Sequence, residues 1–172
     1  MKLLPKERQE LDFKDWATGY AGIVGGNLKG KLWFCGIEYG GNDDEIIFIS
    51  PEENQQSYNG VPCWDNKEEI FSQIKKSRLQ YDYKCAKIAC LYFGLPIDDY
   101  KNYFIDSLFY SNGETFKLNL YPLAFKDRKL ERWTKNHILK TGFETKLLYQ
   151  KWCEENRFPI LKSLVKKHQP EI

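Results

Sequence analysis

Apolar and polar positions recur with two different periods along this chain, and each period predicts one kind of element. Residues 31–37 form a short apolar run that predicts a strand. Residues 115–121 alternate in the manner of a second strand, which Pro122 stops. Another apolar run at 45–50 precedes a polar stretch at 51–62, which we expect to be a surface loop.

Helical spacing accounts for most of the other apolar positions. It predicts one long or broken helix from residue 66 to Gly94 and further helical segments at 126–140 and 144–156. A final helix is expected to begin at Pro159, because proline is tolerated in the first turn. Residues 1–20 are expected to cover the core as a helical or irregular segment. Since strands alternate with helices, the sequence predicts a three-layer α/β fold with a central, largely parallel sheet flanked by helices.

The composition fits one globular domain over residues 1–172. Aromatic residues make up 16% of the chain, a high share that provides rings for a ligand or for nucleic acid as well as for the core. The formal net charge of +2 is too small to indicate nucleic-acid binding by itself, so any basic surface must be local.

The five cysteines are odd in number and form no C-x-x-C pair, so we expect reduced, buried thiols. The first residues are charged, and no window is apolar for long enough to form a signal sequence or a membrane span. These features predict a cytoplasmic protein that does not contact a membrane.

The turn after the first strand carries the most distinctive chemistry. Gly36, Glu38, Tyr39 and Gly40 bring a carboxylate, an aromatic ring and close backbone approach to one turn. The carboxyl ends of strands are where open α/β folds bind their ligands. Asn119 lies near the end of the second predicted strand and is expected at the same edge.

Three stretches together resemble the uracil-DNA glycosylase superfamily, in particular its bacterial glycosylase-like members. They are residues 34–41 (FCGIEYGG), 117–122 (KLNLYP) and 152–164 (WCEENRFPILKSL). In that family the first motif reads Gly-x-(Asp or Asn)-Pro, whereas this chain has Glu38 at the third position and Tyr39 in place of the proline. The family's second motif, a histidine-bearing loop, is expected after residues such as 170–172. The resemblance therefore implies either a truncated chain or a member that lacks this motif.

The resemblance implies hydrolysis of an N-glycosidic bond in an extruded nucleotide. Glu38 would stabilise the oxocarbenium-like sugar and orient water, Asn119 would bind the base edge through its amide, and Tyr39 or Phe48 would stack on the base. Each residue also has a structural interpretation. Glu38 could cap a helix or a backbone N–H, Asn119 could form a turn, and Phe48 could belong to the core.

The densest basic stretch follows the second predicted strand. Trp133 and His137 lie within it, and such a cluster suits phosphate contacts and base stacking. The alternative places Trp133 on the apolar stripe of a helix. The basic residues proposed to contact nucleic acid are Lys126, Arg128, Lys129, Arg132 and Lys135.

The remaining motifs predict neither a metal nor a cofactor. Asp43, Asp44 and Glu45 could bind a hard cation, but no second carboxylate group completes a metal site, so we expect a solvated loop. The glycines at 22–26 lack the spacing of a dinucleotide or P-loop motif. The sequence thus predicts a uracil-DNA glycosylase-like protein that binds DNA or a nucleobase ligand, and the alternative is a non-catalytic module that binds a protein partner.

Overall fold

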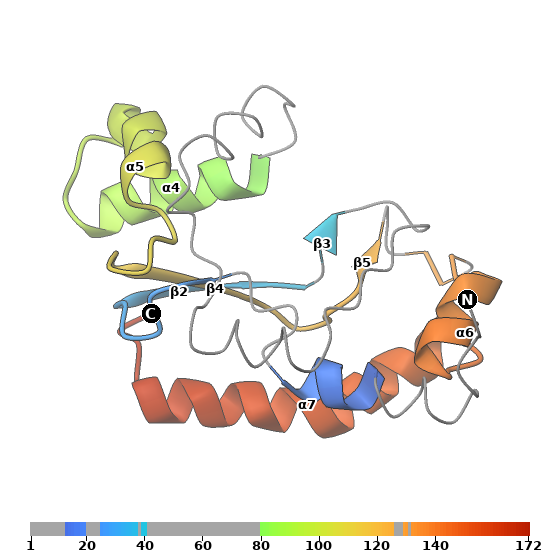
Figure 1. Cartoon of the computed structure of the whole chain (residues 1–172). Coiled ribbons are helices and arrows are strands. Elements are labelled where there is room, and N and C mark those ends of the chain that lie inside the picture. The colour runs from blue at the N-terminus through green and yellow to red at the C-terminus, as the bar shows by residue number, and fades with distance from the viewer. Residues whose placement is uncertain (1–12, 20–24, 38, 41–79, 126–128, 131) are drawn as a thin grey trace. The chain divides into compact units, whose positions relative to one another are not determined.

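The computed structural model describes residues 13–19, 25–37, 39–40, 80–125, 129–130 and 132–172 (Figure 1). The chain divides into two compact units, each built from segments that are distant in sequence. Unit 1 contains the described residues 13–19, 36–40 and 119–167, and unit 2 contains 25–35, 80–118 and 168–172.

Helices hold most of the regular structure. Residues 13–18 are helical, which is one of the two forms expected for the first segment. The other helices are α4 (Gln80–Tyr92), the short 3-10 helix η1 (Ile97–Asp99), α5 (Tyr100–Asp106), α6 (Lys135–Thr141) and α7 (Lys146–His168). The strands are β1 (Gly25–Gly26), β2 (Leu32–Gly36), β3 (Tyr39–Gly40), β4 (Thr115–Asn119) and β5 (Ala124–Phe125).

The predicted three-layer fold with a central, largely parallel sheet is wrong. The described residues form a three-stranded sheet in the order β1-β4-β2 and a separate two-stranded sheet of β3 and β5. β1 pairs with β4 in the antiparallel direction, and β3 pairs with β5 in the parallel direction. The predicted strands contain β2 and β4, whereas β1, β3 and β5 were not predicted. β1 consists of two glycines and has no apolar pattern to reveal it.

The central position of β4 explains its burial. Residues 115–119 are all buried, although the alternation of apolar and polar residues predicts one solvent-exposed face. Leu32 N–H donates to Glu114 O (3.1 Å) and Leu120 N–H donates to Gly36 O (2.9 Å), so β2 and β4 run in the same direction. On the other side, a Cβ at Gly26 would lie 2.5 Å from Thr115 O, so only glycine permits this approach of β1 to β4.

The chain end adds to the outer edge of β2 in unit 2. Glu171 N–H donates to Lys31 O (2.8 Å) and Trp33 N–H donates to Ile172 O (2.8 Å). The ring of His168 packs on Trp33 at a centroid distance of 5.8 Å, and the Tyr92 hydroxyl donates to the Glu171 carboxylate. We call residues 168–172 the tail.

One long helix replaces the two that were predicted at 144–156 and from Pro159. α7 runs from Lys146 to His168 with Pro159 in its interior, so the expected break at the proline is wrong. Its buried positions recur every three or four residues through the proline, and this continuous packed face keeps the helix intact. The buried residues are Lys146, Tyr149, Cys153, Arg157, Leu161 and Leu164.

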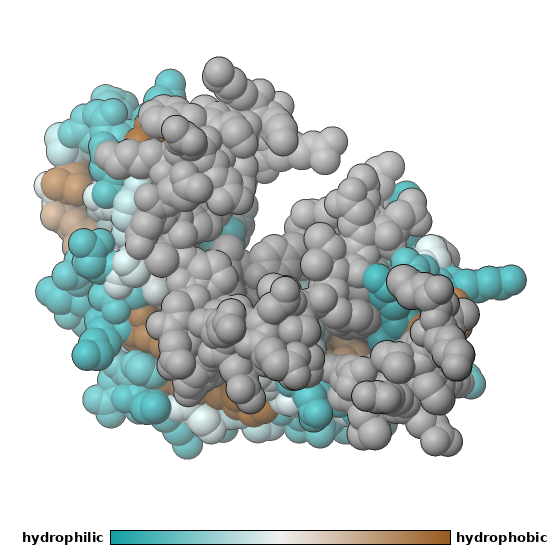
Figure 2. Space-filling view, viewed as in Figure 1, coloured by the Kyte–Doolittle hydropathy of each residue, from teal (hydrophilic) through white to brown (hydrophobic). Residues whose placement is uncertain are grey.

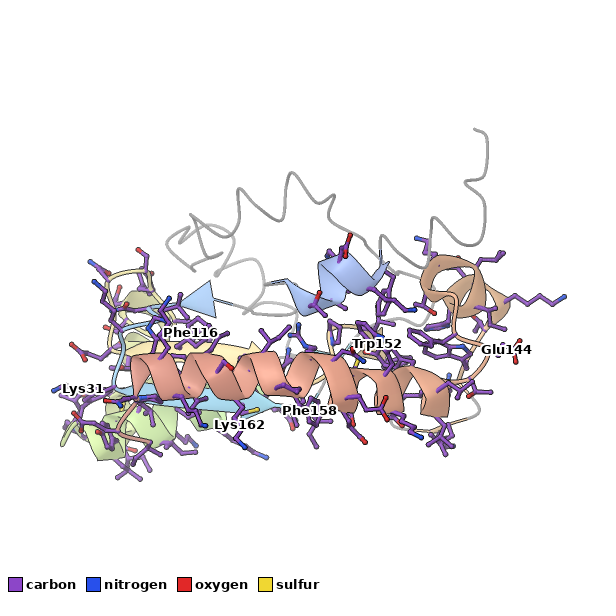
Figure 3. All side chains as sticks on the ribbon, turned by 90° about the horizontal axis from the view of Figure 1, so that it is seen from below. Lys31, Phe116, Glu144, Trp152, Phe158 and Lys162 are labelled. Carbon is purple, nitrogen blue, oxygen red and sulfur yellow. The ribbon has the colours of Figure 1, made fainter. Side chains whose placement is uncertain are left out.

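Each unit has its own apolar core. The core of unit 2 is formed by Leu32, Phe34, Cys85, Ala86, Ala89, Phe104, Leu108 and Phe109. The core of unit 1 is aromatic and is formed by Phe13, Trp16, Ala17, Leu123, Phe125, Tyr149 and Cys153, with Tyr121, Trp133, Phe143, Trp152 and Phe158 packed against them. Figure 3 shows α7 lengthwise, with Trp152 among the rings of this cluster and Glu144 before the first turn.

Candidate nucleobase-binding site

The structure brings together the two segments that the sequence singled out for ligand binding. Leu120 N–H donates to Gly36 O (2.9 Å), and Tyr121 N–H donates to Ile37 O (2.8 Å). The pairing continues in β3 and β5, where Tyr39 is the register partner of Ala124. Residues 36–40 and 119–125 therefore lie side by side in unit 1, and we call this pair of segments the site edge.

Four of the predicted ligand-binding positions belong to the site edge. They are Gly36, Tyr39, Gly40 and Asn119. Glu38 and Phe48, as well as the acidic cluster at 43–45, lie outside the described residues. The structure thus describes the backbone segments of the predicted site but not the predicted catalytic side chain of Glu38.

Arg157 holds the end of β4 in place. This side chain is only 1% exposed. Its guanidinium donates to the carbonyl oxygens of Leu120 (3.0 Å from Nε), Asn119 (3.1 Å from Nη2) and Ala17. Hydrogen bonds from an ionised donor are about twice as strong as neutral ones, and the planar fork fixes their directions. Arg157 therefore ties the site edge to the helix at 13–18.

Arg157 was not predicted as a functional residue, although the spacing of residues on α7 contains a signal for it. Tyr149, Cys153, Arg157 and Leu161 follow one another at intervals of four residues, which places the arginine on the buried stripe of α7. Charged residues are almost never fully buried unless they are paired. An arginine at an apolar position of a helix thus indicates a buried hydrogen-bonding partner.

Asn119 is the last residue of β4 and is 2% exposed. An asparagine that only forms a turn is expected at the surface. Burial and the Arg157 contact to its carbonyl instead give Asn119 a fixed backbone position at the site edge.

Three stacked rings lie at the end of β5. The Phe125 ring stacks on His137 at a centroid distance of 5.4 Å and an interplanar angle of 9°, and Trp133 stacks on the same histidine at 4.7 Å. The buried Lys146 places its ammonium 3.7 Å from the centroid of the Phe125 ring. Because Phe125 is the register partner of Gly40, this group adjoins the site edge.

Tyr149 on α7 contacts the backbone of the site edge. Its hydroxyl accepts the Leu123 N–H at 3.2 Å. Burial, followed by the nearby Cys153 thiol, raises the pKa of Tyr149 well above its ordinary value, so the phenol stays neutral. Tyr149 therefore acts as a neutral, fixed hydrogen-bond partner of the Leu123 N–H.

His137 caps α6. Its Nδ1 accepts the Thr134 N–H at 3.1 Å, and its carbonyl accepts the Thr141 hydroxyl at 2.7 Å. An accepting Nδ1 places the proton of the neutral ring on Nε2. The described contacts assign this histidine to local structure.

The basic stretch is described only in part. Lys129 and Lys135 are exposed and Arg132 is half-buried, whereas Lys126 and Arg128 lie outside the described residues. Trp133 donates its indole N–H to Phe143 O at 2.8 Å and packs on Tyr149 at 5.3 Å. This ring packs against the core of unit 1, but it precedes α6 and so does not lie on a helix as the alternative interpretation expected. It does not serve as an exposed platform for a base.

Unit 2 contains a separate buried polar group. Lys117 on β4 pairs with Asp82 on α4 at 2.6 Å, and its ammonium lies 4.9 Å from the Tyr81 ring centroid. Burial raises the pKa of the neighbouring Cys85 to about 12, so this thiol is a poor nucleophile. Cys90 and Cys153 are also buried, as predicted, but Cys35 in β2 is exposed. Cys63 lies outside the described residues.

Among the described residues, no group of three or more histidine, cysteine, aspartate or glutamate side chains could hold a metal ion. No described helix is both long enough and apolar enough to cross a membrane. Comparisons of the chain with protein-family models, curated proteins and solved structures found no match.

Proposed function

We propose that this protein binds a nucleobase-containing ligand in DNA at the site edge, as a uracil-DNA glycosylase-like protein. The observation that supports the proposal is the pairing of residues 36–40 with residues 119–125. These two segments are separated by almost eighty residues in sequence and carry two of the three motifs on which the resemblance depends. Their adjacency is what a shared binding site requires.

The proposed roles follow from the chemistry of each group. Gly36 and Gly40 leave room for a nucleotide against the backbone, and the Asn119 amide offers one acceptor and two donors to a base edge. Tyr39 or Phe48 stacks on the base. Glu38 orients water and stabilises the charge that develops on the sugar, so the reaction is hydrolysis of an N-glycosidic bond.

Phosphate contacts are assigned to the basic stretch. Lys129 and Lys135 are exposed, and Lys126, Arg128 and Arg132 complete the set that the sequence identified. Each neutralised phosphate contributes about 0.9 to the slope of log K against log salt. DNA binding should therefore weaken steeply as the salt concentration rises.

The test is release of free base from oligonucleotides that contain uracil, hypoxanthine or mismatches, in single-stranded and double-stranded form. Protein is used in excess at low salt. We expect release that is lost in Glu38→Gln and retained in Glu144→Gln, an exposed carboxylate before α7. Release that is equal in both variants would remove Glu38 from the mechanism.

Binding is measured separately from cleavage. Asn119→Asp replaces a donor with an acceptor and should change the base preference in a fluorescence-anisotropy titration, whereas Lys129→Ala should weaken binding to all sequences alike. Lys162→Ala, on the exposed side of α7, is the matched control. An unchanged base preference in a folded Asn119→Asp variant would exclude Asn119 from the site.

A non-catalytic module that binds a protein partner is the second candidate. One observation favours it: large apolar side chains are exposed on α4, where Ile88 is 51% and Leu91 is 62% exposed. Salt dependence separates the two functions, since apolar association should change little over the range in which DNA binding is lost.

A further inference from the structure

The outer edge of β2 already holds an added segment, the tail. Leu32 directs its main-chain N–H towards the segment before β4, whereas its neighbours Lys31 and Trp33 pair with the tail. Glu171 N–H donates to Lys31 O at 2.8 Å, and Trp33 N–H donates to Ile172 O at the same distance. Addition of a segment to a sheet edge supplies affinity through the main chain, whichever copy of the chain the segment belongs to.

Side chains of unit 2 also recognise the tail. The Glu171 carboxylate accepts the Tyr92 hydroxyl and lies 4.0 Å from the Lys31 ammonium. The His168 ring packs on Trp33 at a centroid distance of 5.8 Å. Where Figure 1 marks C, Figure 2 shows a small brown area among teal side chains, which agrees with recognition by hydrogen bonds and charge. We call Lys31, Trp33 and Tyr92 the acceptor edge.

The hinge between α7 and the paired residues of the tail is strained. α7 ends at His168, and Gln169 adopts a left-handed backbone at φ +49°. This conformation is unfavourable for any residue with a Cβ. Pro170 follows, and proline favours an extended backbone in the residue before it. The local preference of the hinge is therefore to open, and short hinges under strain favour exchange of the segment that they carry.

We propose that the acceptor edge binds the tail of a second copy of this chain, so that two copies exchange residues 168–172 about a twofold axis. Each edge then makes the contacts described above, with Gln169 extended in both copies. The exchanged segment is the part of the chain that belongs to unit 2 after unit 1 ends at Lys167. This proposal does not depend on nucleobase binding.

Two effects set the concentration at which exchange occurs. In the monomer, the short hinge holds the tail near its own edge at an effective concentration on the order of millimolar. In the dimer, both hinges are extended and release their strain, which lowers the concentration that is required. We therefore expect a dimer with a Kd of about 100 μM.

The first test alters the hinge and leaves the acceptor edge intact. The full chain is equilibrated at about 10 to 500 μM, a range that brackets the expected Kd, and is examined by sedimentation velocity. Gln169→Gly removes the strain and should raise the Kd at least about tenfold, whereas Gln169→Val disfavours the left-handed turn further and should lower it. Gln80→Val, at the exposed start of α4, is the matched control. A monomer at all concentrations, or a dimer that both Gln169 variants leave unchanged, would overturn the proposal.

The second test shows whether the tails change places. Lys31→Glu and Glu171→Lys each put like charges together within one copy, at side chains that are exposed and whose replacement spares the core. In an exchanged heterodimer of the two variants, both edges join opposite charges. An equimolar mixture should therefore form several-fold more dimer than either variant alone, and the gain should fall as salt rises. The double variant restores the contact within one copy and should match the unaltered chain. No gain in the mixture would exclude exchange of the tail.

Discussion

The Lys117 ammonium lies 2.6 Å from the Asp82 carboxylate, with both residues less than 9% exposed. One partner comes from the central strand β4 and the other from the first turn of α4. Removal of one member of a buried ion pair leaves an uncompensated charge, which costs about 3–5 kcal/mol. We expect Lys117→Met and Asp82→Leu each to lower the free energy of urea unfolding by such an amount. The double variant should recover most of the loss, and additive losses would show that the two residues act independently.

Replacement of Arg157 should destabilise unit 1 and the site edge. Arg157→Met leaves the carbonyls of Asn119, Leu120 and Ala17 without their charged donor, and each buried unpaired group costs about 1–3 kcal/mol. Arg157→Lys should recover only part of this loss, because an ammonium lacks the planar fork. Urea unfolding of the three proteins measures the order, and full rescue by lysine would contradict the geometric role.

Pro159→Ala should stabilise the protein. Proline removes one hydrogen bond from the interior of α7 and costs up to about 3 kcal/mol relative to alanine, offset by about 1 kcal/mol through its restriction of the unfolded chain. Since Pro159 is exposed, alanine loses little packing. We expect a gain of about 1–2 kcal/mol in thermal unfolding. A loss of stability would mean that the proline stabilises a local geometry that a regular helix cannot adopt.

Two glycines with positive φ should differ sharply when they are replaced. Nothing lies within 4 Å of a Cβ at Gly94, so Gly94→Ala should cost only the strain of its φ of +70°, about 1 kcal/mol. At Gly26, by contrast, a Cβ would meet Thr115 O at 2.5 Å, so Gly26→Ala should cost several times more and separate β1 from β4. Equal losses of unfolding free energy in the two variants would contradict the described pairing of β1.

The protein should become less stable in alkali. Burial raises the pKa of Cys85 and of Cys153 from 9.0 to about 12. Between these values the unfolded chain loses thiol protons that the folded chain keeps, so the free energy of unfolding falls as the pH rises from 9 to 12. Below pH 9 the contribution is complete. Chemical unfolding at a series of pH values tests this, and a Cys85→Ala, Cys153→Ala double variant should show a shallower decline.

Local patterns predicted several elements correctly. The apolar run at 31–37 contains β2, and the helical spacing up to Gly94 contains α4. In α4 the buried residues Cys85, Ala86, Ala89 and Cys90 recur at helical spacing, although Ile88 and Leu91 of the same helix are exposed. The first three residues of β2 are buried in succession, as a continuous apolar run predicts. The same agreement holds for the helix at 13–18, where Phe13 and Trp16 enter the core of unit 1.

Contacts between distant residues could not be predicted in this way. From the alternation of β4, Lys117 is expected on the solvent-exposed face of the strand. Its pairing with Asp82, 35 positions away, explains why it is buried instead. Arg157 likewise finds carbonyl partners on two other segments. Local rules also placed a helix start at Pro159, where the packing of residues on both sides overrides the preference of the proline. The layered sheet was inferred from the order of elements, and order alone does not fix how strands pair.

The docking of the tail onto β2 affects how unit 2 folds. This unit joins segments that are far apart in sequence, and the Trp33 N–H donates to the carbonyl of Ile172. The entropy of closing so long a loop must be lost before this contact forms, so the pairing is intrinsically slow. Folding molecules therefore spend an interval with the edge of β2 uncovered, and this interval is when they are most exposed to chaperones and proteases.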